Sequence, residues 1–376
     1  MRVLHVSDVM GGGVLTSVIG MVEATPELDH HLFARSRSGH DTGADPVERF
    51  GSVHVMPTNP LAAVVELRRV CRELFPDVVH AHSSVAGLMV RLVGVDARVV
   101  YSPHCFAFER RDLTQVQRRM ITAVERRLAG RTDMLLAVAP SELEVAARLG
   151  YRHLAYAPNR AALEGVPVAR HSDQLRIVAV GRICRQKDWR FFLHVKRYAE
   201  QELGVTASWE WLGGGPERHE RELERAGVTV SGWLEHNQVL RRLSRAQVFL
   251  HTAAWEAGPL SVLEAAAVGL PLVLRGIDAL SSLELPGISD SAVGLAHRIA
   301  ELESADRWQA AQQRSIQLAS RYSREVQRQR LLDAYAHVCA EHPEALHLGG
   351  QHVEAVAIPA QRSVRWAVGA GDERHG

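Results

Sequence analysis

The feature that most constrains the fold of this chain is a repeated alternation of short, β-branched apolar runs with helix-forming segments. The first run, residues 3–7, leads through glycines into an apolar-periodic segment at 10–22, and the same order returns at 76–92 and 133–150. Strands that alternate with helices pair in parallel, because each helix carries the chain back across the sheet. Residues 1–158 are therefore predicted to form one doubly wound, Rossmann-like α/β domain.

The alternation stops and then restarts, which predicts a second domain. Residues 159–173 are irregular and rich in turn residues, and we assign them to a linker. A second Rossmann-like domain is expected over 174–320, followed by a helix at 321–342 and a disordered tail at 343–376. The length of 376 residues agrees with two domains, since a single core rarely grows beyond ~250–300 residues.

The charge balance and the cysteine content exclude several kinds of protein. The chain carries 44 basic and 43 acidic residues, so it has no overall field that would attract nucleic acid. Its 4 cysteines are scattered and form no metal-binding motif, which predicts a reduced setting. The N-terminus lacks the apolar core of a signal peptide, and no stretch has the length of a membrane span. We expect a cytoplasmic protein, with at most peripheral contact at the inner membrane face.

The first candidate binding loop is the glycine run at residues 11–13. Missing side chains let a phosphate approach the backbone, and the helix that follows directs its amide dipoles toward it. Nicotinamide-binding domains begin in the same way, but they usually carry a carboxylate at the end of the second strand, and residues 30–37 contain none. The sequence contains no P-loop motif. Phosphate binding and simple strand-to-helix packing both remain open for this loop.

A second loop, GRICRQK at residues 181–187, follows a predicted strand and presents Arg182 and Lys187 at its carboxyl end. Ligands of open α/β sheets bind at that end of the strands. Lys187 is one of only two lysines in the chain. A forked guanidinium and a compact ammonium together suit a diphosphate. The alternative is a solvated basic loop.

A third loop, EAGPLSVLE at residues 256–264, contains two glutamates separated by a turn. Glu256 lies in the loop, and Glu264 lies inside the predicted helix. A carboxylate on a largely apolar helix is costly to bury without a partner, so hydroxyl groups of a ligand are one explanation for Glu264. A plain salt bridge is the alternative.

Histidines are common in this chain, which has 20 of them, so a single one carries little information. His104 follows the predicted strand at 99–101 and is kept as a candidate for chemistry. His80, His82 and His153 are assigned to packing or to the surface.

Taken in order, these loops resemble those of the large family of retaining glycosyltransferases with the GT-B fold, glycosyltransferase family 4-like, group 1. The resemblance implies two Rossmann-like domains that face a central cleft, with a C-terminal helix packing back across the junction. It implies an enzyme that needs no metal or cofactor and moves a sugar from a nucleotide-diphosphate sugar to a hydroxyl of a carbohydrate, a lipid-linked sugar or a small molecule. The matching stretches are 11–13, 76–82, 99–104, 135–142, 180–187, 211–220, 231–233 and 256–271.

The resemblance also implies roles for particular residues. Glu264 is expected to bind the ribose, Glu256 to face the transferred sugar, and His104 to face its reacting side. One departure is Ala257, which stands where relatives usually have a glycine after the first glutamate. The residues implied in diphosphate binding are Arg182, Lys187, Gly12, Gly13, Gly258 and Leu260.

Other interpretations remain at this level. A nucleotide-sugar 2-epimerase shares the two-domain fold, and a noncatalytic relative would bind the nucleotide sugar without transferring it. A covalent adduct on Glu256 and attack from the leaving-group face are both compatible with retention; we favour the second, because the diphosphate can take the proton of the acceptor.

The segment 110–131 is predicted to form a basic amphipathic helix in the first domain. Its apolar residues fall on one face and most of its arginines on the other. We favour a helix that turns its apolar face to the core, with at most weak membrane contact, over one that binds a lipid surface. The apolar residues are Leu113, Val116, Met120, Val124 and Leu128, and the arginines are Arg111, Arg118, Arg119 and Arg126.

Overall fold

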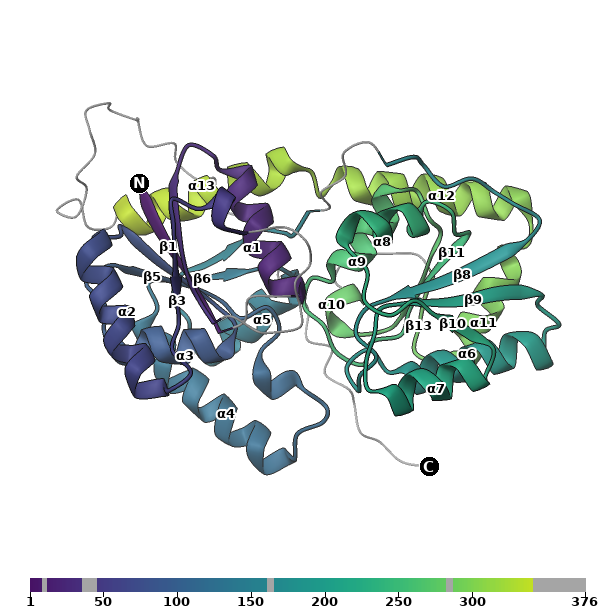
Figure 1. The fold of residues 1–376 in the computed structure, drawn as a ribbon, viewed down its shortest axis with the longest axis horizontal. Helices are drawn as coiled ribbons and strands as arrows, with labels where there is room; N and C mark the ends of the chain where they lie inside the picture. The colour runs from purple at the N-terminus through teal and green to yellow at the C-terminus, as the bar shows by residue number, and fades with distance from the viewer. Residues whose placement is uncertain (9–11, 36–45, 161–165, 282–286, 341–376) are drawn as a thin grey trace, which may run out of the picture. The chain divides into compact units, whose positions relative to one another are not determined.

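Two parallel β-sheets organise the chain in this computed structural model, which describes residues 1–8, 12–35, 46–160, 166–281 and 287–340 (Figure 1). The first sheet has the strand order β3-β2-β1-β4-β5-β6-β7, and the second has the order β10-β9-β8-β11-β12-β13. Every strand pair in both sheets is parallel. The predicted doubly wound α/β fold is confirmed. The tail predicted at 343–376 lies outside the described residues.

The strands of the first sheet are β1 (Arg2–Ser7), β2 (Asp29–Ala34), β3 (Ser52–Val55), β4 (Val78–His82), β5 (Arg98–Ser102), β6 (Met134–Ala137) and β7 (Leu154–Tyr156). Those of the second are β8 (Leu175–Val180), β9 (Ala207–Leu212), β10 (Val228–Val230), β11 (Val248–His251), β12 (Leu272–Arg275) and β13 (Ile288–Ser289). In each sheet the strand order reverses beside the first strand, β1 or β8, and the loops at such a switch point are where ligands bind in this kind of sheet.

Helices accompany both sheets (Figure 1). The last one, α13 (Arg324–Ala340), contacts α1 (Gly12–Ala24), β6 and β7, so the C-terminal helix packs on the first domain. The others are α2 (Pro60–Leu74), α3 (Ser84–Val93), α4 (Gln115–Leu128), α5 (Pro140–Leu149), α6 (Trp189–Gln201), α7 (Glu217–Arg225), α8 (His236–Leu243), α9 (Leu260–Ala267), α10 (Asp278–Ser281), α11 (Ala292–Glu301) and α12 (Ala305–Ser320).

Strand β4 shows how polar groups enter the core of the first domain. All five of its residues are buried, as expected for a central parallel strand covered on both faces. Two of the five are His80 and His82, and His5 on the neighbouring β1 is buried beside them. Their assignment to packing agrees with this burial, but their ring nitrogens need hydrogen-bond partners there.

The orientation expected for helix α4 is wrong. Three of the five residues that were expected to face the core are in solvent: the exposed fractions are 66% for Val116, 65% for Met120 and 46% for Val124. The buried residues of this helix are Glu125 and Leu128. None of the helices in the described ranges is both long and apolar enough to cross a membrane.

A buried ion pair explains this orientation. The Glu125 carboxylate lies 2.9 Å from a guanidinium nitrogen of Arg91, and both side chains are almost fully buried. The hydroxyl groups of Tyr151 and Tyr101 also donate to this carboxylate, at 2.9 and 3.2 Å. A buried charge requires such partners, so Glu125 turns toward the domain and the stripe at Val116 turns away from it.

Candidate functional site

The carboxyl ends of β8 and β9 approach each other closely because glycines stand there. Gly181 has φ +134°, and a Cβ on it would lie 2.7 Å from Cε of Lys187. Gly213 has φ +139°, and a Cβ on it would lie 2.3 Å from the carbonyl oxygen of Gly181. Only glycine readily adopts this backbone conformation and leaves this space. The Lys187 side chain can therefore lie across the end of the sheet.

Lys187 and Glu256 form an ion pair at this edge. Nζ of Lys187 lies 2.6 Å from Oε1 of Glu256, and both side chains are largely buried. Two hydrogen bonds join the loops that carry them: the Thr252 hydroxyl donates to the Lys187 carbonyl at 2.8 Å, and the Ala254 amide donates to the Gln186 carbonyl at 2.8 Å. The structure thus brings together two residues that the sequence suggested for adjacent groups of one ligand.

Arg182, the second predicted cation, is exposed on the same loop. It makes no hydrogen bond or ion pair with any residue that the structure describes. Its guanidinium is therefore available to an incoming anion.

Two unforeseen residues lie close to this pair. Arg275, at the end of β12, is bonded to Asp188 at 2.7 Å. His251, at the end of β11, is buried, and neither of its ring nitrogens has a hydrogen-bond partner among the residues that the structure describes. Burial and, next, the charges of Lys187 and Arg275 hold the pKa of His251 well below its usual value. The imidazole is neutral and adds no charge to the site.

Glu264 has a different partner. It lies on α9 with only 6% of its surface exposed, and its Oε1 is 2.8 Å from Nε2 of His236, the first residue of α8. The hydrogen bond that the Glu264 carboxylate accepts raises the pKa of His236. Glu264 therefore has a partner within the protein, as the alternative requires, and ribose binding by Glu264 stays a prediction. His236 could not be predicted as the partner of Glu264 from the sequence, because it stands 28 positions before Glu264 and no spacing rule connects residues that far apart.

Gly258 and Leu260, whose diphosphate contacts remain a prediction, lie just before and at the start of α9. The cap residue Pro259 makes no side-chain cap, so the first amides of the helix lack such a partner. The carbonyl of Gly258 accepts a 2.7 Å hydrogen bond from the side-chain amide of Asn159. The hydroxyl of Ser261, on the first turn, is buried and has no hydrogen-bond partner within the described ranges. This hydroxyl is a further polar group that sequence reasoning missed.

His104 lies in a strained turn after β5. Its φ is +49° and that of Cys105 is +83°, both in the left-handed region that non-glycine residues seldom adopt. The amide of Cys105 donates to Glu142 at 2.8 Å, and the amide of Val138 donates to the other oxygen of the same carboxylate at 2.8 Å. Burial raises the pKa of Glu142 to about 7. This carboxyl group holds the turn in place, and strain of this kind often marks functional loops.

The turn at His104 and the loop at Gly258 meet the same segment. A Cβ on Gly258 would lie 3.0 Å from the carbonyl oxygen of Val138, which follows β6. The charge of Glu256 is also close enough to act on the pKa of Cys105, which burial raises first. The structure thus brings the His104 turn near the Glu256 loop.

The glycine loop of the first domain is described only in part. Gly12 and Gly13 begin α1, and a Cβ on either would meet nothing within 4 Å. Gly11 lies outside the described residues. Open space beside these amides is compatible with the predicted phosphate contact, which remains a prediction.

Family models match both halves of the chain. Residues 11–160 match the model described as Glycosyltransferase Family 4. Residues 174–302 match the model described as Glycosyl transferases group 1. The first match contains the His104 turn, and the second contains the Lys187–Glu256 pair and Glu264.

Individual relatives agree with these matches. An uncharacterized 41.2 kDa protein in the cps region of Klebsiella pneumoniae is 23% identical over 78% of this chain and 85% of its own length. An Escherichia coli UDP-Gal:α-D-GlcNAc-diphosphoundecaprenol α-1,3-galactosyltransferase is 24% identical over 58% of this chain and 62% of its own length. The solved structure of Anabaena HepE with UDP-glucose has a TM-score of 0.73 and 15% identity, over 90% of this chain and 100% of that one.

The fold and these matches define a class. Two Rossmann-like domains stand in the order of a GT-B glycosyltransferase, and each matches a glycosyltransferase family model. The chain therefore has the GT-B fold and the two-domain composition of a glycosyltransferase.

Proposed function

We propose that this chain is a retaining, metal-independent glycosyltransferase that moves a sugar from a nucleotide-diphosphate sugar to a hydroxyl acceptor. The observation that carries the proposal is the Lys187–Glu256 ion pair at the carboxyl edge of the second sheet, with the exposed guanidinium of Arg182 on the same loop as Lys187. A diphosphate competes with Glu256 for Lys187. When it binds the two cations, it frees the carboxylate to accept hydrogen bonds from the sugar.

The two cations serve the reaction as negative charge grows on the leaving group. The bond between the anomeric carbon and the diphosphate oxygen breaks through an oxocarbenium-like state, in which positive charge spreads over the sugar. Lys187 and Arg182 stabilise the departing diphosphate, the role that a metal ion has in other transferases. The acceptor oxygen bonds to the anomeric carbon from the same face, and its proton passes to the diphosphate, which retains the configuration.

The relatives indicate which substrates to test first. UDP is part of the donor in the name of the Escherichia coli relative and of the ligand in the Anabaena structure. The Escherichia coli protein uses a diphosphoundecaprenol-linked acceptor. A UDP-hexose and a lipid-linked sugar are therefore the first pair to supply, and polysaccharide or glycolipid synthesis is the expected setting.

The test is release of nucleotide diphosphate that depends on the acceptor. Lys187→Ala and Arg182→Ala are each expected to lower turnover by ~10²–10³, because each removes a pre-positioned donor to the leaving group. Arg190→Ala is the matched control, since Arg190 is a nearby exposed arginine whose ion-pair partner is Glu222 on α7. Near wild-type turnover in either site variant, with the control unchanged, contradicts the assignment.

The same assay separates the other functions. A 2-epimerase converts the nucleotide sugar without an acceptor, and a noncatalytic relative binds it and releases no diphosphate. Loss of turnover in EDTA contradicts metal independence. The anomeric configuration of the product, read by NMR, decides between retention and inversion.

A further inference from the structure

Four histidines form one continuous hydrogen-bonded chain through the first sheet. They come from β2, β1, β4 and the turn after β5, which are neighbours in the strand order. His104 Nε2 lies 3.0 Å from His82 Nδ1, His82 Nε2 lies 2.9 Å from His5 Nδ1, and His5 Nε2 lies 3.0 Å from His30 Nδ1. The far end is His30 Nε2, which lies 3.0 Å from both the carbonyl oxygen and the hydroxyl of Thr25.

The Thr25 end of this chain admits only one direction of donation. A carbonyl oxygen can only accept, and the Thr25 hydroxyl donates its own hydrogen to the Met21 carbonyl at 2.9 Å. Both atoms therefore require a hydrogen on Nε2 of His30. In a neutral imidazole the other nitrogen is then an acceptor, so His30 Nδ1 accepts from His5 Nε2.

The same reasoning passes along every ring. His5 accepts at Nδ1 from His82, and His82 accepts at Nδ1 from Nε2 of His104. The rings are neutral, because burial holds the pKa of His5 and His82 well below the usual value, lowers that of His30, and lowers that of His104 to about 4. Nδ1 of His104 is left as a bare acceptor, and it makes no hydrogen bond with the part of the chain that the structure describes.

We propose that the chain from Thr25 to His82 is a positioning device that fixes His104 as its Nε2–H tautomer and so presents Nδ1 as a hydrogen-bond acceptor for a hydroxyl group of the bound sugar. His5, His30 and His82 act only through His104, and none of them touches the ligand. The identity of that ligand rests on the proposed function, whereas the tautomer does not. A sugar hydroxyl that donates to this nitrogen is held in one orientation. In the other tautomer Nδ1 of His104 would carry a hydrogen and could not accept that bond.

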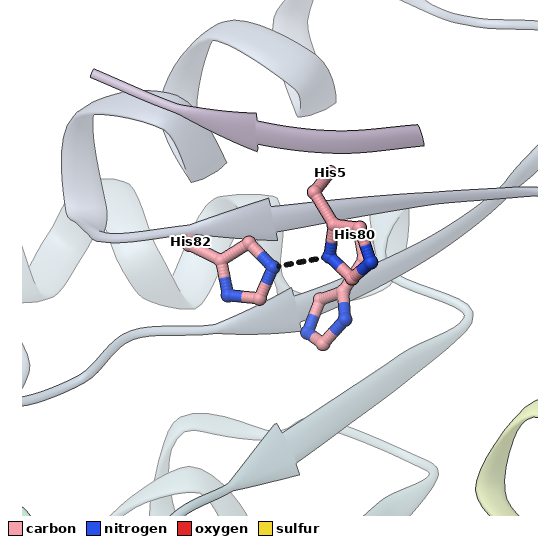
Figure 2. Close-up of side chains that lie close together, drawn as sticks. All are labelled: His5, His80 and His82. Atoms are coloured by element: carbon pink, nitrogen blue, oxygen red, sulfur yellow. Dashed lines mark hydrogen bonds between the residues drawn. The ribbon is translucent and has the colours of Figure 1, made fainter. Parts of the chain in front are cut away.

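A metal site is the competing explanation of this cluster. His5, His80 and His82 each offer a nitrogen within 4.8 Å of the others, and Figure 2 shows their rings together. These nitrogens are already in use, since His5 and His82 share the bond drawn there. His80 is bonded at Nδ1 to the Tyr335 hydroxyl and at Nε2 to the Ser102 hydroxyl, both at 2.8 Å. Metal binding would break at least two of these hydrogen bonds, one of His80 and the one between His5 and His82, so the hydrogen-bonded chain is the better account.

The direct test is the tautomer of His104 in the wild-type protein. Long-range ¹⁵N–¹H correlation of histidine-labelled protein distinguishes the Nε2–H form from the Nδ1–H form, and the spectrum of His104→Gln assigns the signal. The Nε2–H form is expected at neutral pH. An Nδ1–H form overturns the proposal, whether or not any transfer activity is found.

Variants of His5 test whether the chain sets the tautomer. His5→Leu removes both bonds, so His104 is expected to populate both tautomers and turnover to fall about 10–100-fold, as when a partner that orients a functional histidine is removed. His5→Gln is expected to restore much of the Nε2–H form of His104 and much of the turnover. The amide oxygen of glutamine accepts and its NH₂ group donates, in the same direction as the ring of His5. His80→Gln is the matched control, because His80 is as buried as His5 but is not one of the four histidines linked from His30 to His104.

Two results overturn the proposal at this stage. One is a single Nε2–H form of His104 and wild-type turnover in folded His5→Leu. The other is stoichiometric binding of added zinc by the wild type that both His5→Leu and His80→Gln abolish, since this establishes a metal site. If the tautomers behave as expected but no acceptor or donor supports transfer, the proposed function fails and the positioning chain stands.

Discussion

At the scale of single residues, the two glutamates of residues 256–264 differ in the side chain with which each is paired. Glu256 faces the ammonium of Lys187, while Glu264 faces the imidazole of His236. A ligand with a diphosphate can take the partner of Glu256, whereas ribose hydroxyls would have to add to the bond that Glu264 already makes. The two side chains should therefore respond differently to loss of charge.

We expect Glu264→Gln to weaken binding of the bare nucleotide diphosphate about tenfold, since a hydrogen bond to a charged acceptor contributes ~1.5–3 kcal/mol. Glu256→Gln should leave that binding nearly intact, or tighten it by freeing Lys187, and lower transfer. Calorimetry with UDP measures the first effect and steady-state turnover the second. The opposite pattern would mean that the roles of the two glutamates are exchanged.

At the scale of elements, the Arg91–Glu125 pair decides how α4 sits on the first domain. Glu125→Ala is expected to lower the free energy of unfolding by ~3–5 kcal/mol, because it leaves the buried guanidinium of Arg91 unpaired. The double variant Arg91→Met/Glu125→Leu should recover most of this loss, since apolar residues often replace a buried pair at little cost. Urea denaturation of the three proteins tests this. A double variant as unstable as Glu125→Ala would show that the pair itself is indispensable.

The same helix leads to a prediction about membranes. With Val116, Met120 and Val124 in solvent among exposed arginines, we expect the protein to sediment with anionic vesicles at low salt, each basic residue near the surface contributing ~1 kcal/mol. Changing the three apolar residues to serine should abolish this. The control is Leu61→Ser/Val65→Ser on α2, which removes exposed apolar side chains elsewhere. Equal loss in both variants would point to nonspecific adhesion.

The elements could be predicted from the sequence, but their contacts could not. Apolar periodicity located the strands and the loops at their carboxyl ends, so Lys187 and Glu256 were found as candidates. The face that α4 presents depends on Arg91, which stands 34 positions before Glu125, and periodicity cannot report a buried ion pair. The histidine chain joins residues up to 77 positions apart, and no spacing rule connects them.

At the scale of the whole molecule, Asn159 joins the two Rossmann-like domains. Its side-chain oxygen accepts from the Ser17 hydroxyl on α1 at 2.5 Å, and its amide donates to the carbonyl of Gly258 at 2.7 Å. Gly258 stands two positions after Glu256, so this side chain links the start of the first domain to the loop that carries a candidate catalytic group. The sequence analysis placed Asn159 only at the start of the predicted linker, 159–173.

Because one bond of Asn159 stays in the first domain and the other crosses to the second, the two can be removed separately. Asn159→Asp keeps the acceptor for Ser17 but loses the donor to Gly258, and we expect turnover to fall about tenfold, equivalent to the ~1–1.5 kcal/mol of one buried hydrogen bond. Ser17→Ala removes only the other bond and should leave turnover within about twofold, with a similar loss of unfolding free energy. Turnover and urea denaturation of both variants decide the matter. Equal losses of turnover would mean that Asn159 stabilises the fold without positioning the Glu256 loop.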